Sequence, residues 1–346
     1  MFNPETDAAA FALSYPYFAH EDIYSGYTMG TYTKDQWTLV GGVRYENTHE
    51  KFTRYTDPGS GDLSYKTFAG SYGDVLPSVH VKYAFADNMF LRASWSNTVA
   101  RPNPIDLYQA ESVDVVNYTI FEPNPGLKAL NSSNFDVSYD WYSGALGQFM
   151  VAGFVKDIKN FPFNVVDHPT IDGNVYQRTT VVGNSDGKIT GWEAAFRRKF
   201  DFLPGVFSGL GVDLNYCKLS SHLDSPVRPD NPNLVEQAAY TYNIGIYYAR
   251  QGFFAQLALN TQGESIDEYG DTPNFDNIRA PQSIYDLTAN YTWGHDGNYQ
   301  VYLEWRNITN EPAVYHVRGD APGRGDVLTS RIVSGSNFGG GLRLRF

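Results

Sequence analysis

The feature that most constrains the fold is a period-two alternation of apolar and polar residues. It is clearest in the last ten residues, 337–346. Every second position counting back from the end is apolar or glycine, namely Phe346, Leu344, Leu342, Gly340 and Phe338. Arg345, Arg343 and two further glycines fall between them. Successive side chains of a β-strand point to opposite faces, so this segment predicts a strand with one apolar and one cationic face.

The same alternation recurs through the chain, and its repetition distinguishes two kinds of β fold. Alternating segments lie at 37–46, 78–85, 91–96, 135–142, 191–197, 240–248, 285–293 and 299–306. Large aromatic residues are common at the ends of the apolar sets, and the opposite faces carry charges of both signs. A packed sandwich core does not tolerate such charges, whereas the lumen of a membrane barrel does. The pattern therefore predicts an all-β fold: a transmembrane, antiparallel, up-and-down β-barrel.

Composition excludes several other classes of protein. Aromatic residues make up 16% of the chain, which suits the aromatic girdles of a membrane barrel. No apolar run approaches the roughly 18 residues that a membrane helix needs. The net charge of -12 argues against nucleic-acid binding. Cys217 is the only cysteine, so no internal disulfide can form.

Short turns and long polar segments alternate along the chain. Short turns are predicted at 33–35, 87–88, 143–147, 203–205, 251–252 and 294–297. Long polar segments are predicted at 53–73, 98–132, 167–187, 223–235, 265–281 and 319–326. In bacterial barrels the short turns are periplasmic and the long loops extracellular. The spacing predicts about thirteen strands, at roughly ten residues each.

This odd strand number predicts a partial barrel. A complete single-chain bacterial barrel has an even number of strands. The segment 1–7 also lacks the basic and apolar regions of a secretory signal. We therefore expect residues 1–22 to be the remnant of an extracellular loop, with the first strand near Ile23 to Tyr32. Residues 23–346 are expected to be the C-terminal portion of a larger barrel.

The sequence gives no sign of catalytic chemistry. It contains no phosphate-binding loop, zinc-hydrolase helix or nucleophile elbow. Two His–Asp pairs occur in loops, Asp167–His168 and His222 with Asp224, but isolated pairs of this kind are usually solvated surface groups. We predict neither an enzyme, nor a metal site, nor a cofactor.

A series of short motifs points to one family by its order and spacing. They are Gly42–Glu46, Ala100–Pro102, Asn124–Lys128 with the Asp136 strand after it, Val155–Ile158, Gly191–Glu193, Asn307–Asn310 and the terminal Phe346. Nearly end to end, the chain resembles the C-terminal barrel portion of TonB-dependent outer-membrane receptors. The sequence in hand contains no plug domain, TonB box or early strands, so it cannot itself show energy coupling.

The resemblance implies a 22-stranded barrel, filled by a plug, in the outer membrane of a Gram-negative bacterium. It implies import of a bulky nutrient with energy from TonB, and contacts with outer-membrane lipid, lipopolysaccharide and the barrel-assembly machinery. A ferric siderophore is the leading ligand and an oligosaccharide the alternative. A passive porin without a plug ranks lower, and nothing singles out the catalytic pair of an outer-membrane enzyme.

Two sets of residues follow from this interpretation. Charged residues on the inner face would hydrogen-bond the plug, or else simply solvate the lumen: Arg44, Glu46, Lys82, Arg92, Glu193, Arg197, Glu304, Arg306 and Arg343. Loop residues of aromatic or cationic type would bind the ligand, or else pack within their own loops: Arg101, Tyr108, Tyr176, Arg178, Arg228, Tyr315, His316 and Arg318.

Phe346 is expected to act as an assembly signal, because the resemblance implies that the barrel-assembly machinery reads a terminal aromatic strand. Deleting Phe346 from the parent receptor should lower the yield of inserted protein far more than the stability of what inserts. Loss of one interfacial ring costs about 3 kcal/mol at most. The yield in cells, compared with the unfolding midpoint of the inserted protein, checks this. Normal yield with a lowered midpoint would show an ordinary girdle residue.

Overall fold

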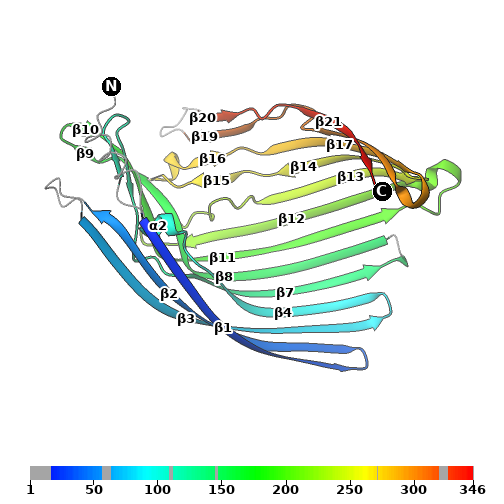
Figure 1. Cartoon of the computed structure of the whole chain (residues 1–346), viewed down its shortest axis with the longest axis horizontal. Helices are drawn as coiled ribbons and strands as arrows, with labels where there is room; N and C mark the ends of the chain where they lie inside the picture. Colours follow the sequence, from blue (N-terminus) through cyan, green and yellow to red (C-terminus); the bar gives the residue numbers. More distant parts are fainter. Residues whose placement is uncertain are drawn as a thin grey trace.

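The computed structural model describes residues 17–56, 64–108, 112–144, 147–270, 272–318 and 326–345. Its main feature is one antiparallel sheet in which each strand pairs with its neighbours along the chain (Figure 1). The thirteen strands are β1 Tyr17–Lys34, β2 Trp37–Thr56, β3 Ser64–Ala86, β4 Met89–Ala100, β7 Leu130–Tyr142, β8 Gly147–Asp167, β11 Gln177–Lys199, β12 Leu210–Asp224, β13 Tyr240–Arg250, β14 Phe253–Gln262, β17 Gln282–Trp293, β18 Tyr299–Arg306 and β21 Asn337–Leu344. Within these described residues β1 and β21 each pair on one side only.

The register aligns apolar residues with apolar residues across the sheet. Leu257 lies between Ile246 and Leu287 on adjacent strands, and its side chain is 47% exposed. On the opposite face Arg92 pairs with Asp140, and Arg197 pairs with Asp213. An exposed apolar face and a charged face are the arrangement of a membrane barrel wall. The predicted fold class, about thirteen antiparallel up-and-down strands, is confirmed.

Five of the predicted short turns, and the described ends of the sixth at 143–144 and 147, lie at one end of the sheet (Figure 1). One two-residue turn joins β13 to β14 through Gln251 and Gly252, whose φ angles are 50° and 83°. Positive φ at both positions suits the twist of a two-residue hairpin. At Gly252 a Cβ atom would lie 2.2 Å from the Thr292 carbonyl oxygen, so only glycine fits. Short 3-10 helices occur in two turns at this same end: η2 Gly205–Gly209 between β11 and β12, and η4 His295–Gly297 between β17 and β18.

The opposite end carries the long connections, and these contain more structure than the sequence predicted. The connection after β4 holds α2 Pro104–Tyr108, β5 Ser112–Asp114 and β6 Thr119–Glu122, and β6 runs parallel to β11. β9 Thr170–Ile171 and β10 Asn174–Val175 form a small hairpin, and η3 spans Pro273–Phe275. β15 Ser265–Glu268, β16 Asn277–Arg279, β19 Ala313–Val317 and β20 Val327–Ile332 form a separate four-stranded sheet. None of the described helices is long and apolar enough to cross a membrane.

The limits of several strands also differ from the sequence prediction. β1 begins at Tyr17, earlier than the expected start near Ile23. β2 continues to Thr56, and β3 begins at Ser64. Both limits fall within the segment 53–73, where the sequence predicted a long loop. Cross-strand contacts explain this extension: the rings of Phe52 and Phe68 stack at 4.8 Å between centroids, beside a hydrogen bond between the Thr53 and Thr67 hydroxyl groups.

The two faces of β14 allow a matched test of which side meets lipid. Leu257 lies midway along β14 on the exposed apolar face, and Gln256 points to the opposite face. Leu257→Arg in the membrane-inserted protein should lower the free energy of unfolding by about 2–4 kcal/mol, because it places a charge in hydrocarbon. Gln256→Arg should change it far less. Urea unfolding in lipid bilayers measures both, and equal losses would contradict this orientation.

Candidate functional site

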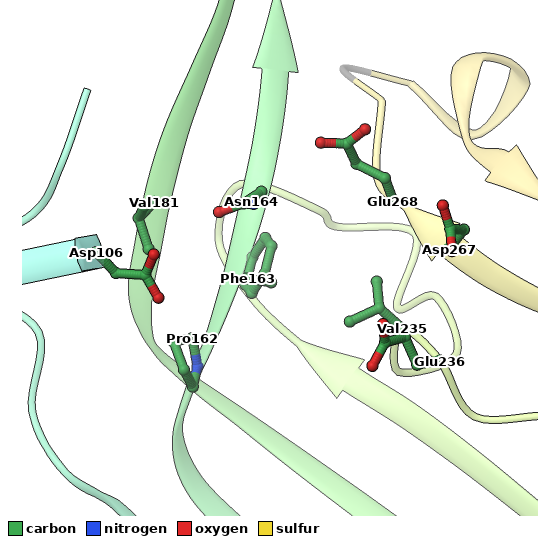
Figure 2. Close-up of a pocket in the computed structure, with 9 residues that line it drawn as sticks. All are labelled: Asp106, Pro162, Phe163, Asn164, Val181, Val235, Glu236, Asp267 and Glu268. Carbon is green, nitrogen blue, oxygen red and sulfur yellow. The ribbon is translucent and has the colours of Figure 1, made fainter. Parts of the chain in front are cut away.

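A cavity of about 440 Å³ lies where the long connections meet the sheet (Figure 2). Its walls come from α2, β8, β11, the connection 225–239 and β15. It is lined by Asp106, Pro162, Phe163, Asn164, Val181, Val235, Glu236, Asp267 and Glu268. Segments that lie far apart in the sequence therefore share one pocket.

Irregular strand geometry builds the floor of the pocket. The pairing of β8 with β11 shifts register between Val182 and Gly187, and such bulges bend strands and re-aim side chains. Phe163, on β8 beyond this bend, meets the ring of Tyr269 edge-on at 5.1 Å between centroids. Phe163 and Tyr269 belong to a buried apolar cluster with Leu223 and Leu234. The floor is thus apolar and well packed.

The rim of the pocket is acidic. A register shift between Ile266 and Glu268 lets two consecutive carboxylates, Asp267 and Glu268, line the same cavity. Figure 2 shows Asp106 on the opposite side, and Glu236 comes from the connection 225–239. No Lys or Arg side chain is among the described residues that line it. Such a rim repels anions and accepts hydrogen bonds from ligand N–H, O–H or cationic groups.

Burial affects the ionisation of two of these carboxyl groups. It raises the pKa of the Asp106 carboxyl above its usual range. Burial, and then the nearby charge of Asp267, raise the pKa of Glu268 as well. Among the described residues, no group of three or more His, Cys, Asp or Glu side chains is placed to hold a metal ion. The rim carboxylates can accept hydrogen bonds from a ligand or pair with a cationic group on it.

The loop cations predicted to bind ligand lie outside this pocket and are paired with carboxylates. Arg101 contacts Glu46 at 2.6 Å, and Arg178 forms a two-point pair with Asp167 at 2.6 and 2.9 Å. Arg318 contacts Glu264 at 3.1 Å. Arg228 is buried between Asp230 and Asp276. Because each of these guanidinium groups already pairs with a carboxylate, fewer of their N–H groups can bind an anionic ligand than the sequence suggested.

The predicted aromatic and histidine contacts are also engaged within the loops. Tyr176 is buried against Tyr118, with ring centroids 5.4 Å apart. Tyr315 lies on β19 between β16 and β20, and the His316 ring is 3.2 Å from an Asp326 carboxylate oxygen. The side chain of Tyr108 lies outside the described residues.

The predicted plug-facing residues lie on the face opposite the exposed apolar one, where most contact another side chain. Arg44 and Glu46 are joined at 2.7 Å, and Arg101 extends this pair into a three-residue network. Further contacts are Arg92 with Asp140, Arg197 with Asp213, Arg306 with Glu304, Arg343 with Gln300, and Lys82 over the Phe90 ring. Glu193 lies opposite Cys217 in the register of β11 with β12. Phe346 lies outside the described residues.

The pocket residues themselves were missed by sequence analysis. Asp106, Glu236, Asp267 and Glu268 are ordinary loop carboxylates in the sequence, and scattered charges usually mean solvated surface. Only the adjacency of Asp267 and Glu268 between two apolar residues hinted at an unusual strand. Their convergence depends on loop pairing that no local pattern encodes.

A wall of antiparallel strands with one exposed apolar face, one charged face and long structured loops at one end is the wall of a transmembrane β-barrel. A family model described as "TonB dependent receptor-like, beta-barrel" matches residues 2–308. The chain belongs to this family of outer-membrane proteins, as its motifs predicted.

Solved structures with this fold include three transporters. The ferric-catecholate import receptor Fiu from E. coli aligns with a TM-score of 0.64 at 16% identity, over 95% of this chain and 45% of its own. The ferric yersiniabactin uptake receptor FyuA from Yersinia pestis gives 0.66 at 16% identity, over 95% and 46%. The copper transporter OprC gives 0.68 at 15% identity, over 96% and 50%. The chain thus spans about half of each relative. No curated protein sequence matches it.

The raised pKa of Glu268 leads to a pH-dependent prediction. The folded state holds this proton more tightly than the unfolded chain, so ionised Glu268 costs local stability above its raised pKa. Glu268→Gln should therefore slow amide hydrogen exchange in β15 and β16 at neutral pH. The difference should vanish as pH falls below the ordinary glutamate pKa of about 4.3. Exchange corrected for intrinsic rates measures this, with the exposed Glu236→Gln as control; a pH-independent difference would contradict the assignment.

Proposed function

We propose that this chain is the C-terminal part of a TonB-dependent receptor that imports a ferric siderophore across the outer membrane. The observation that supports it most is the family match over most of the chain, on a barrel wall whose inner face is charged. Several proteins of similar fold are described as transporters or receptors for ferric citrate, ferric catecholates and ferric yersiniabactin.

The mechanism divides into binding and release. Ligand binds from outside in the space between the long loops, where the pocket offers an apolar floor and an acidic rim. The inner-face charges, including the Arg92–Asp140 and Arg197–Asp213 pairs, offer hydrogen-bonding partners to a plug. TonB pulls on that plug to open a path inward. The barrel lies in lipid and lipopolysaccharide, where the assembly machinery inserts it.

The charge of the pocket narrows the ligand class. Four carboxylates line it, and the loop cations considered above are already paired with acidic side chains. Like charges at close range are repulsive, and the effect is larger in a partly desolvated pocket. The pocket thus favours a ferric complex whose outer groups are neutral, cationic or rich in hydrogen-bond donors over a polyanionic complex.

Radioactive iron uptake by cells that express the complete receptor tests the proposal. We expect iron uptake from a neutral or cationic ferric siderophore to exceed uptake from a polyanionic one, and to fall to background when TonB is deleted. Labelled oligosaccharide is the comparison substrate. TonB-dependent oligosaccharide uptake without iron uptake would replace the siderophore by a sugar, and TonB-independent flux would favour a passive pore.

A further inference from the structure

We propose that Arg228 is a positioning residue that ties the connections 225–239 and 263–281 into one body and so sets the shape of the acidic pocket. Arg228 lies in the connection between β12 and β13 and is 1% exposed. It forms two-point hydrogen bonds with two carboxylates. Its contacts to Asp230 measure 2.9 Å twice, and those to Asp276 measure 2.8 and 3.0 Å.

The two partners lie in different connections, which makes Arg228 a link between them. Asp230 belongs to the same connection as Arg228, whereas Asp276 belongs to the connection between β14 and β17. A fifth hydrogen bond runs from Arg228 Nη1 to the Gly270 carbonyl oxygen at 3.3 Å, also in the second connection. The Tyr269 ring lies against the guanidinium, 4.9 Å from its central carbon to the ring centroid.

These contacts use the whole donor capacity of the side chain. A guanidinium has five N–H groups, and the five hydrogen bonds to Asp230, Asp276 and Gly270 account for all of them. Arg228 has no donor left for a ligand. The loop position that made it a candidate ligand contact in the sequence instead serves to hold protein to protein.

The link is continuous with the pocket wall. The backbone N–H of Glu236 donates to the Ile266 carbonyl at 2.7 Å, and the Tyr269 hydroxyl donates to the Asn233 carbonyl at 2.7 Å. Glu236 lines the pocket from the first connection, and Asp267 and Glu268 line it from the second. The spacing between these carboxylates therefore depends on how firmly the two connections are held together.

The chemistry requires arginine. Lysine is a point charge with three donors and cannot form two-point bonds with two carboxylates in one plane. The Asp276 carboxylate has a further hydrogen bond besides those from Arg228, because its Oδ1 also accepts the Gly270 N–H at 3.0 Å. Removing either partner leaves a buried group of the other without its hydrogen bonds, which opens the contact between the connections.

The test measures loop separation directly, in the complete receptor with Cys217→Ser. Spin labels are attached to cysteines introduced at Val227 and Asn274, one exposed position in each connection. We expect a narrow distance distribution in the parent and a broadened or two-component one in Arg228→Lys, Arg228→Met and Asp276→Asn. Asp230→Asn, whose carboxylate pairs within one connection, should broaden it less. Arg318→Lys, at an exposed ion pair with Glu264, is the matched control and should leave it unchanged.

A second readout connects the link to binding, and this part rests on the proposed function. If only about a tenth of the molecules hold the pocket shape, the apparent affinity for a ferric siderophore should fall about tenfold in Arg228→Met and Asp276→Asn. Heat-modifiable migration on gels confirms that the barrel is folded, and Asp276→Asn, which keeps the buried arginine, serves if Arg228→Met fails to insert.

The two ideas fail separately. An unchanged distance distribution in the folded variants overturns the link, and a broadened distribution with unchanged affinity overturns its role in positioning the pocket. A parent receptor that binds no ferric siderophore counts against the proposed function, and the distance measurement then decides the link alone.

Discussion

The structure depends on the pairing of backbone N–H and C=O groups between adjacent strands. In hydrocarbon there is no water to replace a missing partner, so each group must be satisfied within the protein. From β2 to β18 every strand of the main sheet pairs on both sides. The side chains are then free to differ between the two faces, because the backbone hydrogen bonds between strands do not depend on side-chain type. The positions of the apolar face, the charged face and the loops all follow from this pairing of backbone groups between strands.

This constraint explains which parts of the structure could be predicted from sequence. A strand in the wall must alternate, so the pattern through Trp37, Leu39, Val43 and Tyr45 predicted β2, and the equivalent patterns predicted its neighbours. The turns were visible as short polar or glycine-containing breaks, as at Gln251–Gly252. The number of strands followed from these two signals together.

The loops obey a different rule, and for that reason their structure could not be predicted in the same way. β6 pairs with β11, and β16 pairs with β19, each across a long stretch of intervening chain. The strands β6, β16 and β19 are too short to show a period, so neither their existence nor their partners can be inferred locally. Arg228 shows why local sequence is not enough. In the sequence it is a cation in a polar loop, whereas in the structure it is buried and forms ion pairs with Asp230 and Asp276.

The four-stranded loop sheet limits how these loops can change during evolution. β16 pairs with β15 within its own connection and with β19 in the connection 307–336, so this short strand belongs to two loops at once. A single inserted residue in β16 would turn its side chains to the opposite face and disturb both pairings. Length variation is therefore better tolerated at the tips of these connections than in their paired segments. The outermost loop surface can therefore change in length while the pairing register of β15, β16, β19 and β20 stays the same.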